Sequence, residues 1–427
     1  MSVSSAPKNA AVVAGIDFGT SNSAVSYIDL QGVFHSVLLD QGNNAMPTAL
    51  FFSSEDERIM FGREAMQHYL AGTEGRLMRS IKSLLGSSLM EEQTVVNGVA
   101  ITFFDVLVIF IKELKARAEK SLGTKIDQVV LGRPVHFVDD HPEKDQLAQD
   151  TLGRAAKAAG FQKIGFQLEP IAAALDYEQR LNQETTVLVV DIGGGTSDFT
   201  CIQLNPLRSS QANRSQDILA TTGVHIGGTD FDRLLNLAQV SPQMGFKHKG
   251  TSGREVPSGI FFDLSTWHLI HQAYSRKSLH AAKELRSDFS EPLLHARLMQ
   301  VLEEQQGHRI LASVEQAKIE CSVHNASSAI ELSSIGHQWQ GVAPGLDADN
   351  MKKTLTEPLQ NIVNCAQLCV NQAGLTQVDV IYLTGGSSAL RPLIEVLQDK
   401  FPNSQLVHGD RFGGVAAGLA YAGQHLL

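Results

Sequence analysis

Two segments of the chain share a local pattern whose residue types suit phosphate binding. Residues 15–25 read GIDFGTSNSAV and residues 190–202 read VDIGGGTSDFTCI. Each begins as an apolar strand ending in aspartate, passes through a glycine turn and a Thr-Ser pair, and resumes as a strand. Glycines in such a turn leave backbone N–H groups open to an anion, and the hydroxyls add donors. The pair predicts two strand–turn–strand units that bind a polyphosphate from opposite sides through Gly19, Thr20, Ser21, Asn22, Gly193, Gly194, Gly195 and Thr196.

Three aspartates flank these turns, namely Asp17, Asp191 and Asp198. Carboxylates beside an anion would repel it unless a hard cation lies between them, so they predict Mg²⁺ held largely through water. Either turn alone could be an ordinary glycine hairpin, because Asp and Asn favour turns. The P-loop and dinucleotide-binding motifs are absent from the sequence, which excludes those two kinds of phosphate site.

Strands that alternate with helices must position these turns, which predicts an α/β fold. Apolar strand-like runs occupy residues 11–16, 127–131, 186–191 and 378–384, and helical patterns occupy residues 141–159 and 349–373. A repeated strand–turn–strand unit in two halves of a 427-residue chain predicts two similar lobes facing each other across a cleft. Residues 239–307 are rich in His, Ser and Gln and are expected to form an inserted subdomain.

The composition of the chain limits the kinds of binding partner that are expected. The net charge of −10 argues against nucleic acid or an anionic membrane as the main partner. The longest apolar run, residues 106–111, is too short to cross a bilayer and is expected in a core helix. Residues 1–10 lack a secretory signal, which predicts a disordered leader and a cytoplasmic protein.

Cys365 and Cys369 are interpreted as small buried side chains, and His268 and His271 as packing or surface residues, rather than as metal or redox sites.

Further motifs give the chain a specific resemblance. The two hairpins resemble the phosphate motifs of the superfamily that contains actin, sugar kinases and heat-shock-chaperone ATPases. Residues 168–174 (LEPIAAA), 227–232 (GGTDFD) and 383–387 (LTGGS) resemble, in the same order, segments of the nucleotide-binding domain of DnaK-type chaperones, the heat-shock protein 70 family. The resemblance runs from about residue 12 to residue 422. It implies an actin-like ATPase fold, in which each of two ribonuclease-H-like α/β lobes carries a small inserted subdomain.

The resemblance also implies domain boundaries. Lobe I is expected at residues 11–186 plus 410–427, with its small subdomain at about 53–125. Lobe II is expected at residues 187–409, with its small subdomain at about 231–340. The chain ends at Leu427, soon after the last helix of such an ATPase domain, and in this it resembles the YegD-type subgroup that lacks a peptide-binding domain.

Roles for individual residues follow from the same resemblance. Residues 79–86 (RSIKSLLG) resemble the segment whose lysine, here Lys82, approaches the γ-phosphate, and Glu169 matches a residue near the metal and the attacking water. A solvated lysine and a first-turn helix acid are the simpler alternatives for these two. The three aspartates are implied as Mg²⁺-water ligands or water-orienting groups, and Thr20, Ser21 and Thr196 as phosphate contacts. Residues implied in binding the rest of ATP are Gly227, Gly228, Glu315, Lys318, Ser322, Gly385, Gly386 and Ser387.

The spacing of Glu315, Lys318 and Ser322 places them on one stripe of a helix, which could also be an ordinary exposed face. Two positions near the expected adenine depart from the family pattern. Ile319 and Ala389 stand where arginines are expected, with Arg391 nearby. Loss of two guanidinium contacts should remove roughly 0.5 to 2 kcal/mol each. We therefore expect weaker ATP binding than in a typical family member.

The expected function is that of a Mg²⁺-dependent, heat-shock-protein-70-like ATPase and chaperone that binds ATP and ADP, hydrolyses ATP slowly and moves its lobes as it does so. A protein partner is expected on residues 231–340, and neither nucleic acid nor a membrane is expected as a partner. Two alternatives remain open: a small-molecule kinase of the sugar-kinase type, and a nucleotide-regulated filament or binding module with little turnover.

Overall fold

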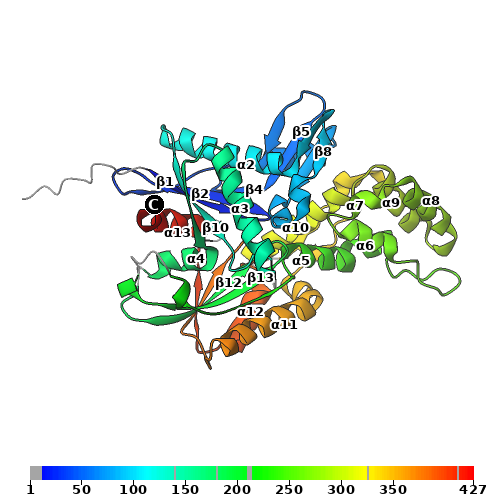
Figure 1. Cartoon of the computed structure of the whole chain (residues 1–427). Coiled ribbons are helices and arrows are strands. Elements are labelled where there is room, and N and C mark those ends of the chain that lie inside the picture. The colour runs from blue at the N-terminus through cyan, green and yellow to red at the C-terminus, as the bar shows by residue number, and fades with distance from the viewer. Residues whose placement is uncertain (1–11, 139–140, 179–180, 209–213, 325–326, 411–412) are drawn as a thin grey trace, which may run out of the picture.

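The structure is a computed structural model that describes residues 12–138, 141–178, 181–208, 214–324, 327–410 and 413–427. The expected leader, residues 1–10, lies outside the described residues. Two mixed sheets form the centre of the molecule, with helices around them and two smaller subdomains extending beyond them (Figure 1). The fold is the mixed α/β type that the alternation of strands and helices predicts.

The first sheet contains the first glycine hairpin, in which β1 and β2 are antiparallel. The strands lie in the order β11-β10-β1-β2-β3, and β4 also pairs with β2. Strands β1, β10 and β11 run parallel to one another. The strands are β1 (Val13–Phe18), β2 (Asn22–Ile28), β3 (Phe34–Ser36), β4 (Ala45–Pro47), β10 (Gln128–Arg133) and β11 (Lys163–Leu168). The helices of this half are α2 (Phe103–Leu122), α3 (Pro142–Ala158) and α4 (Glu169–Glu178).

The second sheet repeats this arrangement around the second hairpin. Its order is β14-β13-β12-β17-β18, with β12 antiparallel to β13 and parallel to β17. The strands are β12 (Thr185–Ile192), β13 (Ser197–Leu204), β14 (Ile218–Val224), β17 (Val380–Thr384) and β18 (Gln405–His408), and the helices are α11 (Ala348–Gln372) and α12 (Arg391–Lys400). Strand order and chain direction agree between the two halves, which confirms the duplicated actin-like fold.

Helices α4 and α13 (Gly414–Leu426) pack against each other and join the two halves (Figure 1). Helix α13 follows β18 in the chain but packs on β1, β2 and β10 of the first sheet. A Cβ on Gly418 would lie 1.9 Å from the carbonyl oxygen of Ala172, so only glycine permits this approach. A shared apolar cluster, with Val13 and Val130 from one sheet and Val189 and Tyr382 from the other, fixes the base of both hairpins.

Two insertions extend from the sheets. The first is mainly β structure: β5 (Ala49–Ser53), β6 (Ile59–Phe61), α1 (Gly62–Ala71), β7 (Gly75–Arg79), β8 (Gln93–Val96) and β9 (Val99–Thr102). The second is mostly helical: α5 (Gly228–Leu235), α6 (Gly259–Ser265), α7 (Ile270–Ala273), α8 (Arg276–Glu284), α9 (Pro292–Glu303) and α10 (Gly307–His324), followed by the short strands β15 (Ser328–Ala329) and β16 (Gly345–Leu346). The region singled out by its composition is thus a helical subdomain.

Local signals explain where the helices begin and end. Helix α2 starts at a capping box in which Thr102 and Asp105 satisfy each other's backbone N–H groups, and its core-facing run includes residues 106–111. Helix α3 starts at Pro142, and Gly160 follows it with φ +96°, a conformation that favours glycine. No helix among the described residues is long and apolar enough to span a membrane.

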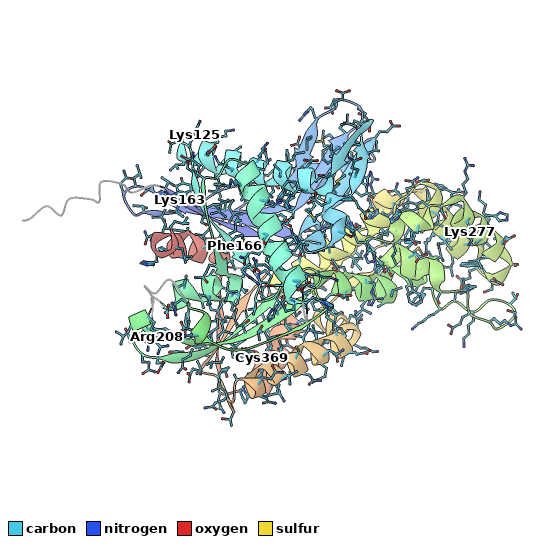
Figure 2. All side chains as sticks on the ribbon, viewed as in Figure 1. Lys125, Lys163, Phe166, Arg208, Lys277 and Cys369 are labelled. Carbon is cyan, nitrogen blue, oxygen red and sulfur yellow. The ribbon has the colours of Figure 1, made fainter. Side chains whose placement is uncertain are left out.

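The cysteines are small packed side chains, as the sequence analysis interprets them. Cys369 on α11 (Figure 2) is fully buried, and its Sγ atom lies 3.7 Å from that of Cys201 on β13. Cys365 lies half-buried one turn earlier on the helix, and all four cysteines are free thiols. They pack beneath the second sheet as small side chains.

Candidate functional site

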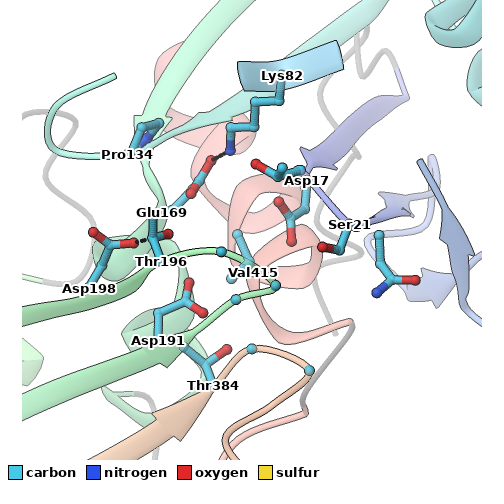
Figure 3. Close-up of a pocket in the computed structure, with 18 of the residues that line it drawn as sticks. Asp17, Ser21, Lys82, Pro134, Glu169, Asp191, Thr196, Asp198, Thr384 and Val415 are labelled. Carbon is cyan, nitrogen blue, oxygen red and sulfur yellow. Dashed lines mark hydrogen bonds and ion pairs between the residues drawn. The ribbon is translucent and has the colours of Figure 1, made fainter. Parts of the chain in front are cut away.

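The turns of the two glycine hairpins face each other across a cavity of about 530 Å³ (Figure 3). Residues 19–22 of the first turn and residues 193–196 of the second line the same cavity. The turns also contact each other, because a Cβ on Gly194 would lie 2.0 Å from Oγ of Ser21. Turns separated by about 175 residues in the sequence therefore form one site.

The local structure of each turn depends on glycine. A Cβ on Gly19 would lie 2.2 Å from the carbonyl oxygen of Asn22, so a side chain there would open the turn. The hydroxyl of Thr48 donates to the carbonyl of Gly19 at 2.8 Å and fixes the turn from behind. In the second turn, the N–H of Gly193 donates to the carbonyl of Thr196 at 2.9 Å. Such tight turns can direct backbone N–H groups toward an anion.

Lys82 and Glu169 form an ion pair at the wall of this cavity, with Nζ 2.8 Å from Oε1 (Figure 3). Lys82 lies in a short 3₁₀ helix, residues 81–84, and Glu169 is the first residue of α4. The side chains are only 12% and 14% exposed. Lys82 is therefore not a solvated lysine, and Glu169 is a first-turn helix acid that also contacts the cavity.

The carboxylates around Lys82 carry excess negative charge. Burial, and next the charge of Glu169, raise the pKa of Asp17 to about 7. Burial and the neighbouring Asp198 raise the pKa of Asp191 to about 8. Burial alone would lower the pKa of Lys82, but Glu169 and Asp17 outweigh it, so the pKa of Lys82 is raised. One ammonium group does not neutralise these acids, and additional positive charge would be bound favourably here.

Strand register places the acids of the second hairpin. Asp191 on β12 lies opposite Asp198 on β13 and opposite Thr384 on β17. The hydroxyl of Thr196 donates to Oδ2 of Asp198 at 3.0 Å. Thr384 lines the cavity, although the sequence analysis assigns it no role. The sequence could have indicated Thr384, because it directly precedes Gly385 and Gly386, which the sequence analysis assigns to the site. Strand pairing then brings Thr384 beside Asp191.

The donor set fits Mg²⁺ held mainly by water and phosphate. The three aspartates line the cavity, and carboxylate oxygens are the ligands this hard cation prefers. No group of three or more His, Cys, Asp or Glu side chains within the described part of the chain could hold a metal directly. Mg²⁺ commonly keeps several waters and takes one or two carboxylates together with phosphate oxygens, which matches this arrangement.

Of the residues expected to bind the rest of ATP, Gly385 and Gly386 line the cavity and the others lie outside its lining. Gly227 and Gly228 begin α5 beside the second turn, since the N–H of Gly228 donates to the carbonyl of Gly193 at 3.0 Å. Ser387 contacts this point, because a Cβ on Gly228 would lie 2.4 Å from its Oγ. Gly385 and Gly386 line the cavity, and Gly385 has φ +82°, which favours glycine.

Helix α10 supplies the expected stripe. Lys318 is 7% exposed, and its ammonium lies 2.8 Å from Oδ1 of Asp232. Burial is the main cause that raises the pKa of Asp232 to about 6, while Lys318 opposes it. The hydroxyl of Ser322 donates to the carbonyl of Lys318, and Glu315 is exposed. The three residues thus lie on one helix with the predicted spacing. Lys318, however, forms an ion pair with Asp232, which the sequence analysis did not assign to the site.

The segment after β10 contributes two residues that sequence reasoning missed, His136 and Phe137. Pro134, His136 and Phe137 line the cavity. Arg133 holds this segment, since its guanidinium pairs with Asp145 of α3 at 2.8 Å and also donates to the carbonyl of Val135 at 3.0 Å. His136 and Phe137 belong to no motif, so only the three-dimensional structure brings them to the site.

A second cavity of about 760 Å³ adjoins the first. The two share Glu169, Asp191, Asp198 and Thr384. Both cavities also share His136, and the hydroxyl and imidazole side chains that line only the second are Thr200, Thr221, Thr222 and His141. The acids of the candidate site are thus approached from two directions.

Comparison with known proteins agrees with this architecture. The family model described as "Hsp70 protein" matches residues 13–241, more than half of the chain. The chaperone protein DnaK of Ureaplasma urealyticum is 27% identical over 409 residues, covering 92% of this chain and 56% of that protein. The chaperone protein DnaK of Thermotoga neapolitana is 29% identical over 225 residues, covering 52% of this chain and 35% of that protein.

The chain spans about half or less of the length of these relatives. The matched region contains both glycine hairpins, Lys82 and Glu169. The duplicated fold, the site between its halves and the family match together establish that this chain belongs to the Hsp70 family.

Proposed function

We propose that this chain binds Mg²⁺–ATP in the cleft and hydrolyses it, and that hydrolysis changes the relative position of the two lobes. One observation supports this most directly: a single cavity collects both glycine turns, the Lys82–Glu169 pair and the three aspartates. The site joins the two halves, so a ligand that contacts both turns would favour a closed arrangement.

The residues divide into two chemical roles. The backbone and hydroxyl groups of the turns bind phosphate, and Lys82 stabilises charge on the phosphoryl group as it is transferred to water. Bound Mg²⁺ supplies further neutralisation of the phosphate oxygens. The candidates that orient the attacking water and accept its proton are Asp17, Glu169, Asp191 and Asp198.

Hydrolysis of ATP by three variants tests this assignment. Lys82→Ala and Asp198→Ala should each lower turnover by about 100-fold, as removal of one electrostatic contact in an active site commonly does. Lys277→Ala is the matched control, because Lys277 is exposed on α8 in the helical subdomain (Figure 2). Equal turnover by the wild type and both site variants would show that the assignment is wrong.

The relatives' name suggests a chaperone role, which we propose for this chain in the cytoplasm. The helical subdomain is the proposed site for a protein partner. We expect capture of such a partner by the full chain to depend on ATP and to weaken in Lys277→Glu, which reverses a charge on α8. Capture that is unaffected by this change and by nucleotide would count against a partner there.

A small-molecule kinase is the second candidate, and the second cavity favours it. Its polar lining and its access to Asp191 and Asp198 suit a hydroxylated acceptor beside the phosphate site. A screen of sugars and polyols for acceleration of ATP turnover separates the candidates. Strong acceleration by one compound, with recovery of its phosphate ester, would favour the kinase over the hydrolase.

A further inference from the structure

Thr48 is a buried residue between β4 and β5 that forms two hydrogen bonds to the first glycine turn. Its hydroxyl donates to the carbonyl of Gly19 at 2.8 Å, and its backbone N–H donates to the carbonyl of Ser21 at 2.9 Å. Thr48 is only 1% exposed, so water does not compete for these bonds. One residue thus holds two of the carbonyl groups of the turn.

The hydroxyl of Ser23 fixes the orientation of the Thr48 hydroxyl. The two oxygen atoms lie 2.9 Å apart, and Ser23 is also 1% exposed. A hydroxyl has one proton, and that of Thr48 is donated to Gly19, so Ser23 is the donor in this contact. The Thr48 hydroxyl therefore has both a donor and an acceptor partner, which favours a single rotamer.

These bonds determine where the other side of each peptide group points. In a planar trans peptide, the C=O of one residue and the N–H of the next point in opposite directions. Because the carbonyls of Gly19 and Ser21 are directed to Thr48, the N–H groups of Thr20 and Asn22 are directed away from it. Thr20 and Asn22 both line the cavity of about 530 Å³. Thr48 thus holds the turn in a shape that leaves these N–H groups available to an anion.

Thr48 also joins this turn to the strands that lead to Lys82. Strand β5 begins at the next residue, Ala49, which pairs with Arg79 at the end of β7. Lys82 follows three residues after Arg79, in a short 3₁₀ helix, and lines the same cavity as Thr20. The chain therefore connects the turn to Lys82 through Thr48 and one strand pair.

Resting on the proposed function, we infer that Thr48 is a positioning residue for phosphate binding and transfer. It holds the N–H groups of the first turn for the polyphosphate and sets the place of this turn relative to Lys82. Thr48 itself does not line the cavity. Removal of its hydroxyl should nevertheless weaken nucleotide binding and slow turnover.

Calorimetric titration with Mg²⁺–ADP tests the hold on the turn. Thr48→Val keeps the shape of the side chain but removes the hydroxyl. It should weaken ADP binding by about tenfold, because the carbonyl of Gly19 loses its partner and the turn can relax. Thr48→Ser keeps the hydroxyl and should bind ADP within about threefold of the wild type. Thr151→Val is the matched control, since Thr151 on α3 is 3% exposed, lines neither cavity and should leave the affinity unchanged.

The outcomes separate this inference from the proposed function. Equal affinity in Thr48→Val and the wild type would overturn the inference and leave the proposed function intact, as would equal losses in Thr48→Val and Thr48→Ser. Failure of the wild type to bind ADP would overturn both. If circular dichroism shows that Thr48→Val is unfolded, Ser23→Ala takes its place. It removes the donor to the Thr48 hydroxyl and should weaken ADP binding by about threefold, and an unchanged affinity would overturn the inference.

A double-variant cycle tests the link to Lys82. Turnover at saturating Mg²⁺–ATP should fall by about tenfold in Thr48→Val, since Lys82 is displaced from the phosphoryl group. In the Lys82→Ala background the same change should lower turnover by less than about twofold, because the displaced ammonium is already absent. A tenfold loss in both backgrounds would show that Thr48 does not act through Lys82 and would overturn the inference.

Discussion

Arg214 and Glu178 form a buried ion pair that fastens the segment before β14 to α4. Nη1 and Nη2 of Arg214 lie 2.8 and 2.7 Å from the two carboxylate oxygens, and the side chains are 2% and 0% exposed. Arg214 also pairs with Asp217. Arg214→Ala should lower the free energy of unfolding by about 4 kcal/mol, because it leaves the Glu178 carboxylate buried without its cation. Urea unfolding followed by circular dichroism measures this change.

The double variant Arg214→Met with Glu178→Leu is the control for that prediction. Apolar side chains of similar volume remove the charges of Arg214 and Glu178 together and should recover part of the lost stability, while Asp217 keeps its ion pair with Arg208. A single variant that loses less than 1 kcal/mol would contradict the prediction.

Site residues that stand in recognisable sequence motifs could be predicted, whereas residues that form ion pairs outside such motifs could not. Both glycine turns, Lys82 and Glu169 stand in recognisable segments, and the structure brings them to one cavity. Arg214 and Glu178 are 36 residues apart, and no local pattern links them. Asp232 stands in the recognised segment 227–232, but its pairing with Lys318 depends on how α5 and α10 pack and could not be predicted.

At the scale of elements, α1 of the first subdomain and α10 of the second are joined across the top of the cleft. The Tyr69 hydroxyl lies 2.9 Å from Nδ1 of His308, and the Nε atom of Arg309 donates to the carbonyl of Leu70 at 2.6 Å. Nε2 of His308 lies 3.0 Å from the carbonyl of Trp267, so Nε2 carries the proton and Nδ1 accepts from Tyr69. The Arg79 guanidinium lies 4.3 Å from the centre of the Trp267 ring. These contacts hold the two subdomains together.

Removal of the Tyr69 hydroxyl should loosen this contact. Tyr69→Phe keeps the ring but loses a hydrogen bond of about 1 kcal/mol, so the proposed nucleotide should dissociate about fivefold faster. Stopped-flow displacement of a fluorescent ADP analogue measures the rate. Tyr421→Phe, on α13 away from the two subdomains, is the control, and an unchanged rate in Tyr69→Phe would show that the contact does not limit release.

The same contact should make stability depend on pH. Burial is the main cause that lowers the pKa of His308 from 6.5 to about 4, with Arg79 acting in the same direction. The unfolded chain therefore binds a proton at a pH where the folded chain does not, and stability falls as pH drops from about 6.5 to about 4. The loss should reach up to about 3 kcal/mol. Unfolding measured across this range should show the loss in the wild type, and His308→Gln should lack that part of it.

At the scale of the whole molecule, duplication made the fold predictable. One repeated hairpin led to two lobes, and the two sheets have the same order and directions. The helical subdomain was predicted only from its change in composition. A high content of His, Ser and Gln does not indicate where helices begin and end or how they pack. The contact of Gly418 on α13 with Ala172 on α4 joins two segments that are far apart in the sequence, and no local pattern predicts it.

The glycine turns of the two lobes meet where Gly194 faces Ser21, and this contact allows a test of closure. A Cβ on Gly194 would lie 2.0 Å from Oγ and 3.2 Å from Cβ of Ser21, whereas a Cβ on Gly195 meets no atom within 4 Å. Gly194→Ala should therefore separate the turns and weaken Mg²⁺–ADP binding by about tenfold, or roughly 1.4 kcal/mol. Gly195→Ala should cause the smaller loss. Combining Gly194→Ala with Ser21→Gly removes the opposing side chain and should restore part of the affinity in calorimetry. Equal losses in the two alanine variants, with no recovery in the double variant, would mean that the turns need not approach each other for nucleotide to bind.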